Sequence, residues 1–241
     1  MLRSCFLSVA VAMLLHGAPA SAQTLSLPDS LVDLRTEQGE KYLKESDDAL
    51  AFGPLVSSYV TQKTQTYCGV ASIVMVVNAL QLQAPAVPEY DPYHTFTQDN
   101  FLDAKTEAII PRAVLAERGM TLDQIGALLA TLSLKVDVVH ASDTTLEAFR
   151  DMARAHLSKP GQFIIANYLR KAMGQEKGGH ISPLAAYDKL TDRFLIMDVA
   201  RYKYPPVWVT AKDLFTAMST TDSDNQNRTR GFVLISKDGA G

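Results

Sequence analysis

Cysteine is nearly absent from this sequence, because its 241 residues include only Cys5 and Cys68. Residues 1–22 read as an export signal, with Arg3 ahead of a short apolar run and a small-residue cleavage site at Ala20-Ser21-Ala22. Removal of the signal takes Cys5 with it and excludes an internal disulfide in the mature chain. A lone thiol in an oxidising compartment is a liability unless it is buried or used, so Cys68 is the first candidate for chemistry.

Long apolar runs, a surplus of positive charge and metal-binding motifs are also missing. The apolar run at residues 6–15 is shorter than the roughly 20 residues that a membrane helix needs, although an uncleaved anchor remains an alternative. The net charge is -3 and the Lys and Arg residues are scattered, so we expect no nucleic-acid partner. The chain has no CxxC and no HExxH motif, so we expect no metal site and no required cofactor.

The mature chain, residues 23–241, is predicted to form a single domain of the α+β class. Helical spacing dominates its first half, and apolar runs typical of strands dominate its second half. Residues 25–60 are expected to form a lead-in on the domain surface. The expected helices are 37–46, one that begins at Cys68, 101–129 in two pieces around Pro111 and Gly119, 146–156 and 211–218; the expected strands are 134–139, 163–168, 180–187, 194–199 and 231–236.

The setting of Cys68 favours a nucleophile over a buried structural thiol. A polar loop ends at Tyr67, and apolar residues at helical spacing follow, which places Cys68 at a helix N-terminus. The helix dipole and unpaired amides at that position lower the pKa of a thiol. Gly69 leaves room for a substrate backbone. The side-chain amide of Gln62 could bond a developing oxyanion, with a buried structural role as the alternative.

His180 is the histidine best placed to act as a base. The mature chain has three others, and they lie in a polar loop (His94), at the end of a strand (His140) and in a polar helix (His156). Capping a turn is the simpler function for His140. His180 instead follows Gly178-Gly179 and opens an apolar run, so a glycine-rich loop delivers its imidazole to the start of a core strand.

Asp198 is the candidate for orienting that imidazole. It follows the apolar segment 194–197, where a carboxylate is costly unless it is hydrogen-bonded. A hairpin through the turn at 189–193 is expected to set Asp198 beside His180. The order Cys, His, carboxylate along the chain is the papain-type order. Together the three residues predict acyl transfer through a thiol nucleophile.

Five segments of the chain form long and specific blocks. They are TQKTQTYCGVAS at 61–72, FTQDNF at 96–101, GGHISPLAAY at 178–187, DRFLIMDV at 192–199 and RYKYPPVWV at 201–209. With these blocks the chain resembles the phytochelatin synthase family, and in particular its short prokaryotic members. The resemblance implies a papain-like cysteine protease fold, with a helical first half and an antiparallel sheet in the second half.

The same resemblance implies a substrate and a set of site residues. The family attacks glutathione at its Cys-Gly bond, releases glycine and keeps γ-glutamylcysteine as a thioester. Cys68, His180 and Asp198 match its triad, and Gln62 matches its oxyanion glutamine. Positions that match its substrate-binding residues are Thr61, Tyr67, Gly179, Arg201, Asp222 and Arg230. An arginine fork suits the α-carboxylate of the γ-glutamyl head and an acid suits its α-ammonium. Either Arg228 or Arg230 could be the arginine that binds the α-carboxylate.

Two departures from the family's pattern bear on function. Plant and yeast members carry a long C-terminal region rich in cysteine pairs and linked to metal response, whereas this sequence ends soon after Ser236-Lys237. It therefore resembles the half-size members, in which hydrolysis of glutathione dominates and phytochelatin synthesis is weak. The export signal predicts a periplasmic enzyme that acts on exported, host-derived or conjugated glutathione. Cadmium or zinc would enter as glutathione thiolate complexes, and the resemblance suggests a homodimer.

Two other functions remain open from the sequence. A papain-type peptidase or acyltransferase of other specificity would use the same Cys, His and Asp, and comparing γ-glutamyl with α-linked peptides would separate it. A non-catalytic binder of glutathione or its metal complexes would keep the pocket without turnover. Slow labelling of Cys68 by iodoacetamide would favour the binder.

Overall fold

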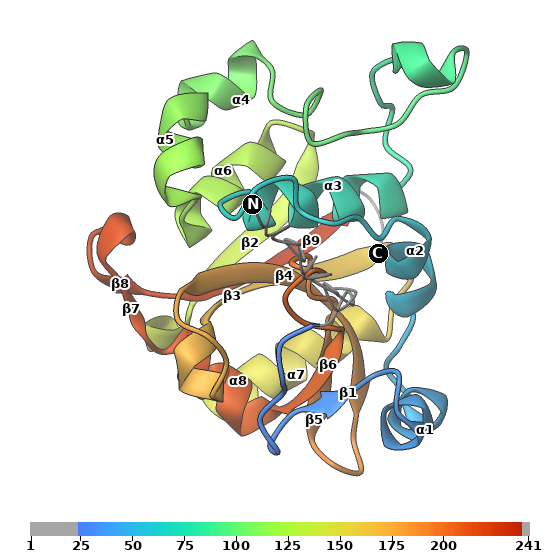
Figure 1. Cartoon of the computed structure of the whole chain (residues 1–241), viewed down its shortest axis with the longest axis vertical. Helices are drawn as coiled ribbons and strands as arrows, with labels where there is room; N and C mark the ends of the chain where they lie inside the picture. The colour runs from blue at the N-terminus through green and yellow to red at the C-terminus, as the bar shows by residue number, and fades with distance from the viewer. Residues whose placement is uncertain (1–23, 238–241) are drawn as a thin grey trace, which may run out of the picture.

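A computed structural model describes residues 24–237, and Figure 1 shows a central sheet with helices on both sides. The export signal and Cys5, predicted within residues 1–22, lie outside the described residues. Helices dominate the first half of the chain and an antiparallel sheet the second half, so the predicted α+β class is confirmed. Between residues 24 and 237, no helix has the length and apolar character needed to cross a membrane.

Seven strands form the central sheet in the order β1-β6-β5-β4-β3-β9-β2, and every neighbouring pair is antiparallel. Their bounds are β1 Val32–Asp33, β2 Leu134–His140, β3 Gln162–Leu169, β4 Gly179–Asp188, β5 Arg193–Ile196, β6 Val207–Thr210 and β9 Gly231–Lys237. The central strands β3 and β4 are buried along almost their whole length. Continuous apolar runs produce such strands when both faces of a sheet are covered.

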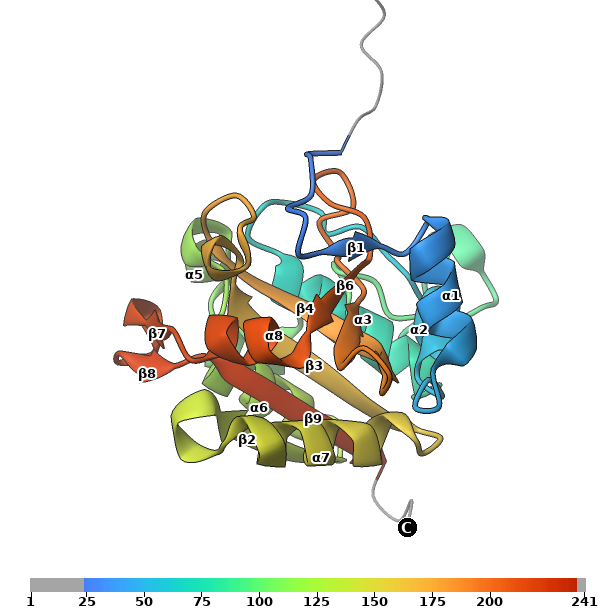
Figure 2. The ribbon, with the colours of Figure 1, turned by 90° about the horizontal axis from the view of Figure 1, so that it is seen from below.

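Helices cover both faces of this sheet. α3 (Cys68–Ala79) and α6 (Leu122–Ala130) pack on one face, while α7 (Leu146–Leu157) and α8 (Ala211–Met218) pack on the other, as Figures 1 and 2 show. The other elements are α1 Glu37–Glu45, α2 Phe52–Ser57, α4 Ala104–Ile109, α5 Arg112–Arg118, the two-stranded ribbon of β7 Thr221–Asp222 and β8 Arg228–Thr229, and the 3-10 turns Pro88–Tyr90, Ala141–Asp143, Arg170–Met173 and Ser223–Asn225.

The central helix α3 is buried on every side over its first ten residues, Cys68 through Val77. A helix that is apolar all round has no solvent face and belongs in a core. Tyr67 precedes it without a side-chain cap, so the first backbone amides of α3 receive no side-chain acceptor from that residue. The fold therefore presents Cys68 at an uncapped helix N-terminus inside the molecule.

Several element predictions need correction. Residues 101–129 form three helices, because both Pro111 and Gly119, at φ +77°, separate helical turns. β6 and α2 are missing from the sequence prediction. The lead-in is more than a surface segment, since Leu31 and Leu55 are 5% and 0% exposed within the core.

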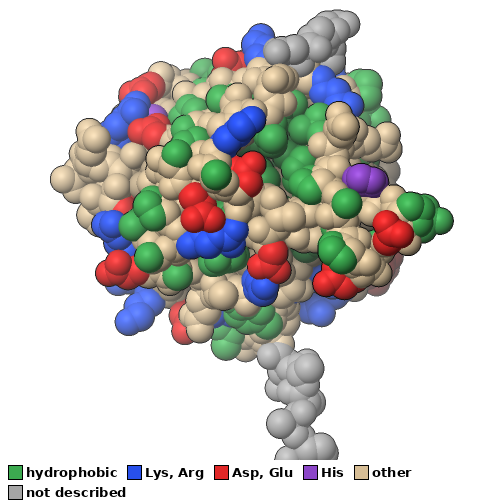
Figure 3. All heavy atoms as spheres, turned by 90° about the horizontal axis from the view of Figure 1, so that it is seen from above, with side chains coloured by type: hydrophobic (Ala, Val, Ile, Leu, Met, Phe, Trp, Pro, Cys, Tyr) green, Lys and Arg blue, Asp and Glu red, His purple; other side chains and the backbone are tan. Residues whose placement is uncertain are grey.

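Charged side chains of both signs are interspersed on the face drawn in Figure 3. Positive side chains on this face have acidic neighbours, and hydrophobic side chains lie between them. On this face neither sign of charge is gathered into a separate patch.

Candidate active site

Cys68 is the first residue of α3, and it is 7% exposed. Because α3 packs against β4, the thiol lies within hydrogen-bonding reach of the Ile181 backbone, and that of Gly69 is also close. Burial raises the pKa of Cys68, while these backbone groups and the Arg170 cation act in the opposite direction. Burial therefore outweighs the helix N-terminus, which was expected from the sequence to lower this pKa, and a base takes the thiol proton before attack.

His180 lies near the start of β4 and lines the same cavity as Cys68. Gly178 before it has φ +123°, a conformation that glycine adopts readily and other residues rarely do. The Nε2 atom of His180 lies 2.9 Å from Oδ1 of Asp198 and 3.0 Å from Oγ of Ser182. Because Nε2 faces the carboxylate, the pattern assigns it the proton and leaves Nδ1 as the nitrogen that can accept one.

Asp198 lies just past the end of β5 and is 0% exposed. The predicted hairpin between β4 and β5 is confirmed by their antiparallel register, and it sets the carboxylate beside the imidazole. The backbone amide of Ala200 donates to Oδ1 over 2.8 Å. The hydroxyl of Tyr59 donates to the backbone carbonyl of Asp198 over 2.5 Å, which holds the loop that carries the carboxylate.

Arg170 is a member of this group that sequence reasoning missed. Its side chain is 4% exposed, and its two terminal nitrogens lie 2.7 Å and 2.9 Å from the two oxygens of Asp198. It also donates to Oε1 of Gln175 over 2.7 Å and lies over the ring of Tyr204, 5.0 Å from its centroid. A charged residue directly after the apolar strand β3 was the available signal, since the same argument singled out Asp198.

The charges of this cluster favour a neutral imidazole at rest. Burial alone would raise the pKa of Asp198, but His180 and Arg170 outweigh it and hold that pKa well below its usual range. Burial lowers the pKa of His180; Asp198 opposes this and the Arg170 cation adds to it. One buried guanidinium already balances the buried carboxylate, so His180 can stay neutral and act as a base.

A cavity of about 190 Å³ opens beside Cys68 and His180. Of the substrate-binding residues expected from the sequence, the structure brings Gly179, Asp222 and Arg230 into its wall. Nη2 of Arg230 lies 3.6 Å from Oδ1 of Asp222, and both side chains are largely buried. Nε of Arg230 is buried and has no hydrogen-bond partner within residues 24–237. An acid and an arginine with spare donor capacity suit a ligand that carries both an ammonium and a carboxylate.

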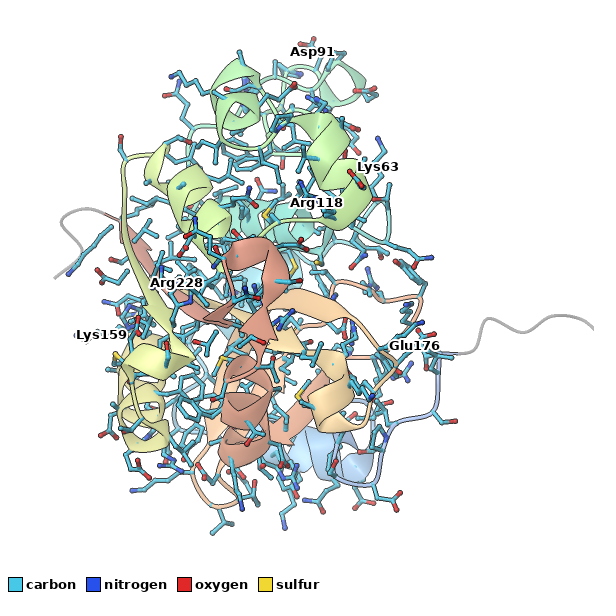
Figure 4. The ribbon with its side chains drawn as sticks, turned by 90° about the vertical axis from the view of Figure 1, so that its left-hand side faces the viewer. Lys63, Asp91, Arg118, Lys159, Glu176 and Arg228 are labelled. Atoms are coloured by element: carbon cyan, nitrogen blue, oxygen red, sulfur yellow. The ribbon has the colours of Figure 1, made fainter. Side chains whose placement is uncertain are left out.

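The wall also contains residues that were not expected from the sequence, among them Asn167, Arg118 and Asp224. Asn167 of β3, which pairs with Ile181 of β4, is 3% exposed. Arg118 of α5 and Asp224 lie at the more exposed part of the wall, with 3.7 Å between Nη1 and Oδ1. Figure 4 labels Arg118 where the helical layer faces the turn that carries Asp224. The cavity therefore has a buried charge pair inside and an exposed one nearer to solvent.

Other predicted substrate-binding residues lie elsewhere. Thr61, Tyr67 and Arg201 are not among the residues that line this cavity. The guanidinium of Arg201 lies over the ring of Tyr59, 4.5 Å from its centroid. Tyr67 precedes α3, and the backbone oxygen of Thr61 accepts from Gln98 over 2.9 Å.

Of the two arginines that could bind the substrate carboxylate, the structure places Arg230 at the cavity. Arg230 lines the cavity, whereas Arg228 is 47% exposed and pairs with Asp123 at 3.2 Å and Asp143 at 3.4 Å. Figure 4 labels Arg228 beside β2, well apart from Arg118. Arg228 therefore ties the ribbon to α6 and leaves the cavity to Arg230.

Gln62 is 4% exposed, and its backbone amide donates to the carbonyl of Val199 over 2.9 Å. Its side-chain Nε2 donates to the backbone oxygen of Thr64 over 2.7 Å and to the hydroxyl of Tyr202 over 3.1 Å. Both N–H bonds of the amide are thus in use. The structure places the predicted oxyanion glutamine in the loop before Cys68, outside the residues that line the cavity and with both donors occupied.

Two of the other histidines in the described part of the chain, His140 and His94, make structural contacts. His140 is buried, with Nε2 2.8 Å from Oδ1 of Asp123 and Nδ1 against the backbone oxygen of Thr229. It therefore joins α6 to β8, a longer-range contact than the turn cap expected from the sequence. His94 contacts the backbone oxygen of Ala84 over 3.1 Å. Neither lines the cavity of Cys68.

The site combines a buried thiol, a neutral imidazole and a carboxylate that a guanidinium holds in place. The thiol comes from a helix N-terminus and the imidazole from the sheet against which that helix packs. This papain-like placement suits formation and breakdown of a thioester. The cavity beside it has the size and the charges to suit a small zwitterionic acyl group.

Comparison with known proteins adds an independent observation. The family model described as Phytochelatin synthase matches residues 22–232. Glutathione gamma-glutamylcysteinyltransferase 1 of Arabidopsis thaliana is 33% identical over 91% of this chain and 45% of its own length. Glutathione gamma-glutamylcysteinyltransferase of Schizosaccharomyces pombe is 25% identical over 75% of this chain and 42% of its own length. The chain thus spans less than half the length of these curated relatives.

Among solved structures, the interpain A cysteine protease of Prevotella intermedia shows a likeness with a TM-score of 0.39 and 13% identity. The aligned region covers 80% of this chain and 96% of the protease.

Proposed function

This chain belongs to the phytochelatin synthase family, and from that premise we propose that it cleaves the Cys-Gly bond of glutathione through a thioester on Cys68. The observation that supports this most directly is the cavity, which sets Asp222 and Arg230 beside Cys68 and His180. The α-carboxylate and α-ammonium of a γ-glutamyl head match these two charges. An internal residue of an α-linked peptide has neither a free α-carboxylate nor a free α-ammonium, whereas a γ-glutamyl head offers both to this acid–arginine pair.

In the acylation step, Nδ1 of His180 takes the proton of the Cys68 thiol, and Sγ attacks the carbonyl carbon of the Cys-Gly bond. A Cys68 thioester forms, the C–N bond breaks, and the proton on Nδ1 passes to the nitrogen of the leaving glycine. Asp198 stabilises the transient imidazolium, and Arg170 keeps Asp198 ionised. The N–H of Gln62 and the backbone N–H of Cys68 bind the oxyanion.

In the second step, an acceptor takes γ-glutamylcysteine from the thioester. Water gives hydrolysis to γ-glutamylcysteine, and the amine of a second glutathione gives a phytochelatin. We propose that hydrolysis dominates, since the buried charge pair binds one γ-glutamyl head while the outer wall at Arg118 and Asp224 is half exposed. Water reaches a thioester in such a cavity without a binding site of its own.

Cadmium or zinc enters this proposal as a thiolate complex of the substrate, because soft cations prefer sulfur ligands. The periplasmic location and the homodimer stay predictions, and size-exclusion chromatography together with fractionation of cells would examine them. A periplasmic enzyme would act on exported, host-derived or conjugated glutathione.

Mass spectrometry of the purified mature chain with glutathione tests the proposed function. Glycine, γ-glutamylcysteine and an acyl-enzyme mass are expected, and the acyl-enzyme should be missing from Cys68→Ser. Addition of Cd²⁺ should produce longer thiol peptides in small amounts only. If neither product nor adduct forms, the glutathione assignment fails. Cleavage of α-linked peptides would then support the peptidase, and binding of glutathione without any turnover would support the binder.

A further inference from the structure

Both N–H bonds of the Gln62 amide are used in the free enzyme, whereas its Oε1 is buried and has no hydrogen-bond partner within residues 24–237. Its Nε2 has two N–H bonds, and they are donated to the backbone oxygen of Thr64 at 2.7 Å and to the hydroxyl oxygen of Tyr202 at 3.1 Å. The side chain is 4% exposed, so water cannot readily replace either acceptor. A donor in this state cannot also bind an oxyanion, and one of its two partners must leave first.

Of the two acceptors, the Tyr202 hydroxyl is the one free to leave. The bond to Thr64 is the shorter one, and it is made to backbone of the same loop as Gln62. A primary amide is planar, so anchoring one N–H at Thr64 fixes the direction of the other. The hydroxyl oxygen of Tyr202 therefore marks the point at which an acceptor for Gln62 has to sit.

The backbone around Tyr202 is anchored on both sides of that residue. Nζ of Lys203 pairs with Glu176 at 2.9 Å, and the hydroxyl of Tyr204 accepts from the backbone amide of Glu176 over 2.8 Å. The neighbouring Arg201 lies over Tyr59. The Tyr202 side chain itself is 46% exposed, and within residues 24–237 its contact with Gln62 is the one hydrogen bond of its hydroxyl group. The ring can thus swing into solvent while the loop stays in place.

We propose that Tyr202 is a gate over the oxyanion site: its hydroxyl occupies the second N–H of Gln62 in the free enzyme and is displaced as the substrate carbonyl becomes an oxyanion. This inference rests on the proposed function, in which Gln62 is the oxyanion donor. Tyr202 is a positioning residue, since it acts through Gln62 and takes no part in bond making.

The physical consequence is that the donor becomes available mainly in the transition state. A neutral carbonyl oxygen and a neutral hydroxyl are similar acceptors, so the ground-state substrate gains little by displacing Tyr202. An oxyanion accepts a charge-assisted bond that is roughly twice as strong, and it displaces the hydroxyl. Gln62 therefore strengthens binding of the transition state more than binding of the substrate, which is the condition for catalysis.

The test is a rapid-quench measurement of the acylation rate in Tyr202→Phe. This variant keeps the ring and removes the competing hydroxyl, so the free N–H of Gln62 stays aimed at the oxyanion position. We expect glycine release in the first turnover to accelerate about 2- to 10-fold, the value of one neutral hydrogen bond expressed as a rate. Tyr93→Phe, at a tyrosine that is 75% exposed, is the matched control and should leave the rate unchanged.

The same substitution in a Gln62→Ala background separates a gate from a structural residue. The gain should vanish there, because no donor remains to be released. Slower or unchanged acylation in folded Tyr202→Phe, or an equal gain without Gln62, would overturn the gate. Thermal melting of each variant verifies that it is folded.

A second acyl donor keeps this test independent of the glutathione assignment. The burst of p-nitrophenol from p-nitrophenyl acetate reports acylation of Cys68 and passes through an oxyanion, but needs no γ-glutamyl recognition. If glutathione is not cleaved while the burst accelerates in Tyr202→Phe, the proposed function fails and the gate stands. If glutathione is cleaved and neither acyl donor shows acceleration, the gate fails and the proposed function stands.

Discussion

Replacing Arg170 with methionine should be among the most destabilising single changes in this chain. The substitution removes a guanidinium that is 4% exposed and leaves Asp198 ionised at 0% exposure, with His180 and the backbone amide of Ala200 as its remaining partners. Breaking a buried ion pair from one side costs about 3–5 kcal/mol of the free energy of unfolding. For a chain of 241 residues, about 2–4 °C per kcal/mol converts this to a fall in Tm of roughly 6–20 °C.

The pH dependence of this loss has a definite sign. The pKa of Asp198 is lowered in the folded chain, so the carboxylate contributes stability above its unfolded pKa of about 3.9 and loses it as the pH falls. Without Arg170 the pKa is lowered less, and this contribution shrinks. The difference in unfolding free energy between wild type and Arg170→Met should therefore be largest near neutral pH and narrow below about pH 4.

Urea denaturation of wild type, Arg170→Met, Asp198→Asn and the double variant is the appropriate assay. Removing both charges should cost less than the sum of the two single losses, because the second change no longer strands a buried charge. A loss below about 1 kcal/mol for Arg170→Met, or additive losses in the double variant, would refute the claim that this pair carries stability.

Three other predictions concern the cavity and its walls. Arg230→Lys should lower kcat/KM for glutathione about 10- to 100-fold through loss of a charge-assisted fork, while Arg228→Lys serves as the matched control; equal effects of the two would contradict the assignment. The pKa that governs the acid limb of the pH profile of kcat/KM should lie below 6.5, because burial lowers the pKa of His180 from that value and the base must be neutral. An acid limb with its midpoint above pH 6.5 would argue against a desolvated imidazole. Gly69→Ala should destabilise the fold by about 1–3 kcal/mol, since its Cβ would lie 2.3 Å from Sδ of Met120; thermal melts should show that a second change, Met120→Ala, recovers part of the loss.

Local sequence context was enough to place Cys68, His180 and Asp198 in one site. A polar loop before an apolar helix, a glycine pair before an apolar strand and a charge after one are all short-range patterns. The β4–β5 hairpin then brings two of the three together because its turn is short. Most helices and strands could also be predicted from the sequence, because the spacing of apolar residues determines where they form.

Contacts between loops were beyond the reach of such patterns. Arg170 meets Asp198 from the β3–β4 connection, and Gln62 meets Tyr202 across 140 positions of sequence. Arg201 was assigned to substrate, yet it lies over Tyr59 because the loop anchors on either side of Tyr202 decide where each side chain points. The spacing of residues along the sequence does not say in which direction a loop side chain points.

The strand order also has a consequence for how the protein is made. β9, the last strand described, inserts between β3 and β2, and Arg230 immediately before it reaches the cavity. During synthesis the ribosome releases Cys68 long before residues 231–237, so the sheet has a gap beside β3 until β9 has been translated. Such long-range pairing closes late. The nascent thiol therefore leaves the ribosome as an ordinary cysteine, and the cavity wall around it is completed only after Arg230 and β9 have been made.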